Sequence, residues 1–132
     1  MKSDNKNEIL KEKLKQALTS TARAISDDFK NRDKPDKNEK SKFFDNFDLE
    51  NLNSKSDFIK ARAEADSLAL KKKFSDDIIF KKNSPSNLSC KSLYSIAEKI
   101  RYESLGCKML KGIHKNLIEN YNQIIELKRK DQ

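Results

Sequence analysis

The chain contains little of what tight turns and β-structure need. Among its 132 residues there are two glycines, two prolines and no tryptophan. A β-sandwich or a β-barrel depends on frequent tight turns, so this composition argues against both folds. Hydrophobic residues make up 35% of the chain and charged residues 38%, which predicts a small core beneath a heavily charged surface. We therefore expect one all-α domain that spans residues 1–132.

Residues that carry catalytic or metal chemistry are equally scarce. One histidine, His114, and two cysteines, Cys90 and Cys107, cannot supply an ordinary zinc or cobalt ligand set. The sequence has no glycine-rich phosphate loop, which excludes ATP binding of the Walker type. It also lacks the D-x-S-x-S metal-ion-dependent adhesion motif. We expect no catalytic residue, no metal ligand and no cofactor bound by this chain, and nothing in it argues for a self-contained enzyme.

Long apolar runs are missing as well. No run approaches 18 residues, and no apolar signal-peptide segment follows Met1. We accordingly expect a cytoplasmic protein that has no membrane partner. Both cysteines fit that compartment as reduced thiols.

Basic residues are abundant but dispersed. The net charge is +8, yet acidic residues are interleaved with lysines along nearly the whole chain. Phosphate contacts usually require clustered Lys and Arg, so a solvated Lys-rich surface is favoured over nucleic-acid binding. The densest cluster, Lys71–Lys73, closes a predicted helix, where cations are favourable in any case. A basic helical nucleic-acid-binding protein remains an alternative function.

Apolar periodicity predicts three main helices, at about 4–29, 57–74 and 89–128. The third has the clearest pattern, and we expect it to be one long helix along which the other two pack. Its inward heptad positions, called the heptad seam below, are Leu93, Ile96, Ile100, Glu103, Cys107, Leu110, His114, Leu117, Tyr121 and Ile124. This seam makes a purely structural coiled-coil interaction module a second alternative function.

Two segments are candidates for a docking surface. Nearly all residues of 30–42 are charged or polar, which predicts a disordered loop. Phe43 and Phe47 follow this loop in a short apolar cluster. The end of the long helix is the other candidate, because Ile118, Ile125 and Leu127 lie off the heptad seam.

Parts of the sequence resemble the N-terminal region of the CobT-type subunit of the aerobic, ATP-dependent cobaltochelatase. The resemblance covers LKQALTSTARAIS at Leu14–Ser26, RAEADSLALK at Arg62–Lys71 and SLYSIAEKIRYESLGCKMLKGIHKNL at Ser92–Leu117. Two family patterns, R-x-x-A-D-S-x-A-L and E-x-x-R-x-E-x-x-G, are followed by a glycine and an N-L pair. The matching residues are Arg62, Ala65, Asp66, Ser67, Ala69, Leu70, Glu98, Arg101, Glu103, Gly106, Gly112, Asn116 and Leu117.

The chain also departs from that family. Glu64, Ser75 and Phe80 stand near positions where the family has histidines, which puts any role of those histidines in doubt here. The acidic linker and the von Willebrand-type domain of the family are absent from this sequence. We therefore expect either an N-terminal fragment or a truncated relative.

The resemblance implies a place in the complex that inserts cobalt into the corrin ring during cobalamin biosynthesis. It implies a non-catalytic adaptor whose partners are an AAA+ ATPase ring subunit and the large chelatase subunit. ATP, Mg and cobalt would be used on other subunits or on missing domains.

Polar family-matched residues within the apolar pattern should pair with one another. They form the set Arg62, Asp66, Glu98, Arg101, Glu103 and Asn116. An inward carboxylate without a partner is costly, so Glu103 requires one. We expect an interhelical network that joins Arg62 to Glu103, with Asp66 and Arg101 nearby.

Overall fold

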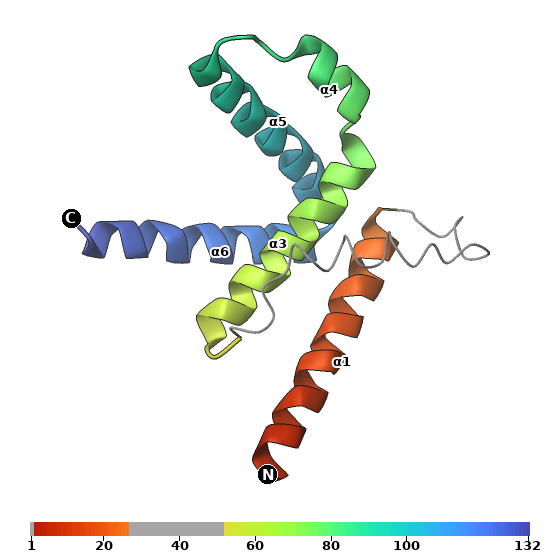
Figure 1. Ribbon diagram of the computed structural model, residues 1–132, viewed down its shortest axis with the longest axis vertical. Helices are drawn as coiled ribbons and strands as arrows, with labels where there is room; N and C mark the ends of the chain where they lie inside the picture. The colour runs from red at the N-terminus through yellow and green to blue at the C-terminus, as the bar shows by residue number, and fades with distance from the viewer. Residues whose placement is uncertain (1, 27–51) are drawn as a thin grey trace.

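A computed structural model of the protein describes residues 2–26 and 52–132, and within them it contains five α-helices and no strand (Figure 1). The all-α prediction is confirmed. The helices are α1 (Lys2–Ile25), α3 (Lys55–Phe74), α4 (Asp77–Asn83), α5 (Leu88–Met109) and α6 (Lys111–Lys130). The predicted loop at 30–42 and the candidates Phe43 and Phe47 lie outside the described residues.

The central element is α3, which contacts α1, α5 and α6. Its buried residues, which lie on several sides of the helix, are Ala61, Ala63, Ala65, Asp66, Ser67, Ala69 and Leu70. Buried residues that do not form a single stripe are typical of a helix that packs against neighbours on more than one side. The expected packing of the second helix on the C-terminal segment is confirmed, because α3 contacts both α5 and α6. The same expectation is wrong for α1, which packs on α3 instead.

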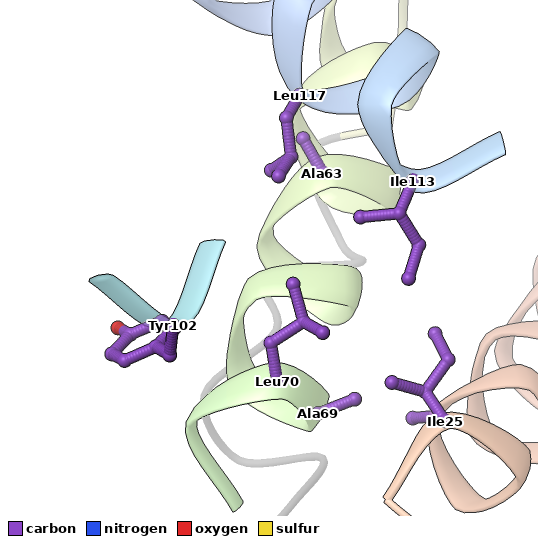
Figure 2. Packing of buried hydrophobic residues seen from close by; sticks show 8 residues of the cluster. Ile25, Ala63, Ala69, Leu70, Tyr102, Ile113 and Leu117 are labelled. Carbon is purple, nitrogen blue, oxygen red and sulfur yellow. The ribbon is translucent and has the colours of Figure 1, made fainter. Parts of the chain in front are cut away.

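Alanines let three helices approach α3 closely. The main core contains Ala22 and Ile25 from α1, Ala63, Ala69 and Leu70 from α3, Tyr102 from α5, and Ile113 and Leu117 from α6. In Figure 2, Leu70 lies between Tyr102 and Ile25, and Leu117 lies beside Ala63. A second, smaller cluster joins Leu18 of α1 to Ala65 of α3. Leu70 is the largest fully buried side chain among the described residues.

The predicted long helix is divided at Leu110. This residue has the extended angles φ −136° and ψ 118°. Its N–H donates to the carbonyl of Gly106 and ends α5, and its carbonyl accepts from the N–H of His114 at the start of α6. The two helices diverge from this point as two arms (Figure 1).

Packing against α3 explains this bend. A straight helix over 89–128 would be about 60 Å long, whereas the 20 residues of α3 span about 30 Å. The bend allows Tyr102 on one arm and Leu117 on the other to reach the same core. It also divides the heptad seam, so the seam does not run along one continuous rod.

Side-chain caps explain where the middle helices begin. Ser54 and Asp57 form a capping box at the start of α3. Asp76 caps α4 and Asn87 caps α5 through their carboxylate and amide oxygens. The short helix α4 is held against α5 by stacking of Phe80 on Tyr94, with ring centroids 4.9 Å apart.

None of the helices in the described ranges is long and apolar enough to cross a membrane.

Candidate docking groove between α5 and α6

An open groove lies between the two arms, with a volume of about 430 Å³. Its lining residues, which come from α5 and α6 alone, are Ile100, Glu103, Ser104, Cys107, Lys108, His114, Leu117, Ile118 and Tyr121. Most of the heptad seam between Ile100 and Tyr121 therefore lines this groove. The seam members Leu93 and Ile96 continue along α5 and are 67% and 55% exposed, so the expected burial of the seam fails there.

Glu103 lines the groove and connects α5 to both α3 and α6. It is buried on α5, and its Oε1 accepts a hydrogen bond of 2.5 Å from the hydroxyl of Ser67 on α3. Its Oε2 accepts a second hydrogen bond, of 2.6 Å, from the hydroxyl of Tyr121 on α6. Lys99 Nζ lies 3.9 Å from Oε1. The inward placement predicted for Glu103 is correct.

The expected pairing of Glu103 with Arg62 is wrong. Arg62 is exposed on α3, and Glu103 takes its partners from two hydroxyls and Lys99 instead. Hydroxyl donors suit this position because a buried carboxylate needs hydrogen bonds, which need not come from a cation. Sequence reasoning assigned Tyr121 to the apolar seam and overlooked its hydroxyl as the partner.

The other family-matched polar residues form two further links to α3. Asn116 on α6 donates to Asp66 Oδ2 at 2.7 Å. On α5, Arg101 pairs with Glu98 at 2.7 Å and also donates to the carbonyl of Phe74. These polar residues therefore form separate connections between helices. They do not form the single network that the sequence led us to expect.

Ser75 adds to the second link. Its hydroxyl donates to Glu98 Oε1 at 2.8 Å, just after the end of α3. Hydrogen bonds from Arg101 and Ser75 hold the pKa of Glu98 below its usual value, against a smaller opposing effect of burial. The Ser75 hydroxyl thus helps to fasten the end of α3 to α5.

The electrostatics of the groove favour neutral hydroxyl and thiol groups. Burial and the hydrogen bond to Glu103 raise the pKa of Tyr121, so its hydroxyl keeps its proton and remains a donor. Burial and the charge of Glu103 also raise the pKa of Cys107. Because the thiolate is the reactive form, a raised pKa lowers the reactive fraction of this thiol.

The predicted docking residues at the end of α6 are exposed. Ile118, Ile125 and Leu127 are 48%, 47% and 57% accessible. The structure places Ile118 in the groove lining, whereas Ile125 and Leu127 lie further along α6 and outside the lining. Sequence reasoning missed the α5 side of this surface, because it treated Leu93, Ile96 and Ile100 as covered core positions.

Asp66 gives a testable pH dependence. Burial raises its pKa, although the hydrogen bond from Asn116 and the charge of Arg62 oppose this. Because the pKa of Asp66 is higher in the folded state, its protonated form contributes to the free energy of unfolding. This contribution is fully present below the unfolded pKa near 3.8 and is lost as pH rises through the folded pKa. We expect Asp66→Asn to gain stability relative to the parent protein between pH 4 and pH 7, measured by urea unfolding.

Asp57→Asn is the matched control for that measurement. Hydrogen bonds from Ser54 and Asn53 lower the pKa of Asp57, so its contribution is present above the unfolded value and lost in acid. The stability difference between Asp57→Asn and the parent should therefore be nearly constant from pH 4 to pH 7 and change mainly at lower pH. A difference for Asp66→Asn that is constant across this range would contradict the account.

Among residues 2–26 and 52–132, no three His, Cys, Asp or Glu side chains are grouped so that they could hold a metal ion.

Comparison with known families gives a direct result. The model of the family described as cobalamin biosynthesis protein CobT matches residues 9–132. The chain belongs to the CobT family. The comparison with curated proteins and the comparison with solved structures each give no match.

The CobT match covers all three segments of the resemblance, Leu14–Ser26, Arg62–Lys71 and Ser92–Leu117. It covers α3, α5 and α6 in full, together with most of α1. The groove and the three polar links therefore lie within the matched region. Family membership assigns this CobT chain to cobalamin biosynthesis.

Proposed function

We propose that this chain is a non-catalytic helical adaptor of a cobaltochelatase complex, in which Co²⁺ is the metal substrate inserted into a corrin ring. Membership of the CobT family supports the pathway. The observation that carries the adaptor role is the open apolar groove between α5 and α6. Large exposed apolar surfaces on a small folded chain are typical of protein–protein interaction sites.

The expected partners are an AAA+ ATPase ring subunit and the large chelatase subunit. In this proposal the ring binds ATP and Mg, and the large subunit holds the corrin ring. The chain described here contributes rigid helices that position one partner against the other. The same proposal places the assembly in the cytoplasm.

Complex formation between purified proteins tests this function. The full chain is mixed separately with the AAA+ ring subunit and with the large subunit of the same organism, with and without ATP, and analysed by size-exclusion chromatography. We expect the chain to elute with at least one of them. Elution of the chain alone in every mixture would contradict the adaptor role.

A further inference from the structure

The apolar surface of the two arms extends beyond the groove in a helical pattern. On α5, Leu93, Ile96 and Ile100 follow one another at spacings of three and four residues, and Ile100 is 60% exposed. On α6, Ile118, Tyr121 and Ile125 repeat the same spacing. Such rows lie along one side of each helix. These two rows and the groove lining between them are called the apolar strip below. An amphipathic helix can cover exposed side chains of this kind by laying its apolar face into the groove.

Positive charge accompanies this strip. Lys108 lines the groove. Lys128 lies on the α6 side that carries His114 and Tyr121, because each residue turns an α-helix by about 100°. These side chains are exposed in the described structure.

The carboxylates of Glu103, Glu119 and Glu126 do not face a partner docked in the groove. Glu103 is the only carboxylate among the groove residues of the described chain, and it is buried with hydrogen bonds from Ser67 and Tyr121. Glu119 and Glu126 lie more than a quarter turn around α6 from the groove side. The rim of the groove therefore presents cations to a partner.

We propose that the groove docks an amphipathic helix of a partner protein, with an apolar face for the strip and acidic residues along its flanks. This inference rests on the proposed adaptor function and names the chemistry of its partner. A second copy of this chain fits less well, because two such grooves face to face would bring like charges together. Acidic flanks, by contrast, meet Lys108 and Lys128 and favour rapid association.

Variants of the full chain test the placement, with the AAA+ ring subunit and the large chelatase subunit as probes. We expect Ile100→Asp and Ile118→Asp each to weaken the binding of one probe at least tenfold. The double variant Lys108→Glu, Lys128→Glu should weaken it severalfold, with a loss that shrinks as salt rises. Ile78→Asp is the matched control, since Ile78 is 80% exposed on α4, away from the groove, and its replacement should leave affinity unchanged.

Circular dichroism of each variant separates docking from folding. Ile100 and Ile118 are largely exposed, so both variants should remain helical and melt as the parent does. A parent chain that binds neither probe contradicts the proposed function itself. A parent chain that binds, together with groove variants that bind equally well, overturns only the docking site. Self-association of the parent that Ile118→Asp abolishes would assign the groove to a second copy and overturn the inference.

The two cysteines provide a readout that needs no substitution. Cys107 lines the groove, whereas Cys90 is exposed near the other end of α5. Bound partner should slow alkylation of Cys107 by iodoacetamide at least severalfold and leave Cys90 reactive, as measured by mass spectrometry. Equal alkylation of Cys107 in the free and bound chain would overturn the inference.

Discussion

Replacement of Glu103 by alanine is expected to lower the free energy of unfolding by about 3 kcal/mol. The substitution removes the acceptor of the Ser67 and Tyr121 hydroxyls, which lie on two different helices. Ser67 is only 8% exposed, so water cannot readily replace its lost partner. Urea unfolding followed by circular dichroism at pH 7 measures the change.

Two further variants separate this hydrogen bonding from the loss of side-chain volume. Glu103→Gln keeps the size and one acceptor oxygen, and it should cost about 1 kcal/mol. A double-mutant cycle of Glu103→Ala with Tyr121→Phe should show a coupling energy of at least about 0.5 kcal/mol. Additive effects of the two substitutions would show that the bond between α5 and α6 contributes nothing to stability.

Gly106→Ala is expected to lower the free energy of unfolding by about 1–2 kcal/mol. A Cβ at this position would overlap the side chain of Leu70, which is fully buried and cannot move aside. Overpacking of this kind typically costs about 1–3 kcal/mol. The better helix propensity of alanine returns up to about 1 kcal/mol of that cost.

Gly112→Ala is the matched control, since both glycines are helical and both match the family pattern. Nothing lies within 4 Å of a Cβ built at Gly112. This variant should be as stable as the parent or more stable by up to about 1 kcal/mol. Equal thermal stability of the two alanine variants would contradict the close approach of α5 to α3 at Gly106.

The helices themselves could be predicted from the sequence because their local patterns are strong. Apolar periodicity located three main helices at about 4–29, 57–74 and 89–128, and α1, α3, α5 and α6 fall largely within these ranges. The central position of α3 was missed for a physical reason. Its buried faces consist largely of alanine, which contributes little hydrophobic contrast, although it allows neighbouring backbones to come close.

The bend at Leu110 could not be read from local sequence. No proline interrupts the heptad seam, and the seam keeps its spacing through Cys107, Leu110 and His114. The extended conformation of Leu110 is set by the packing of both arms on α3, which is a long-range effect. Exposure of Leu93, Ile96 and Ile100 follows from the same bend, so the α5 side of the groove was missed as well.

The candidate site could be predicted in part. An inward carboxylate at Glu103 and an exposed Ile118 follow from their heptad positions, and the structure agrees with both. The partner of Glu103 could not be inferred from the sequence, because a cationic side chain such as Arg62 is a more obvious partner for a carboxylate than a neutral hydroxyl. Hydroxyls of Ser67 and Tyr121 occupy that role because they lie inside the packed interface, whereas the long Arg62 side chain remains in solvent.

Amide hydrogen exchange on the chain, free and bound to the AAA+ ring subunit or the large chelatase subunit, tests the central claim most directly. The claim is that the chain acts as an adaptor through the open sides of α5 and α6. We predict that binding slows exchange in α5 from Leu93 to Lys108 and in α6 from His114 to Lys128, while exchange in α1 is unchanged. Slowed exchange confined to α1 or α4, or no change with either partner, would contradict the account.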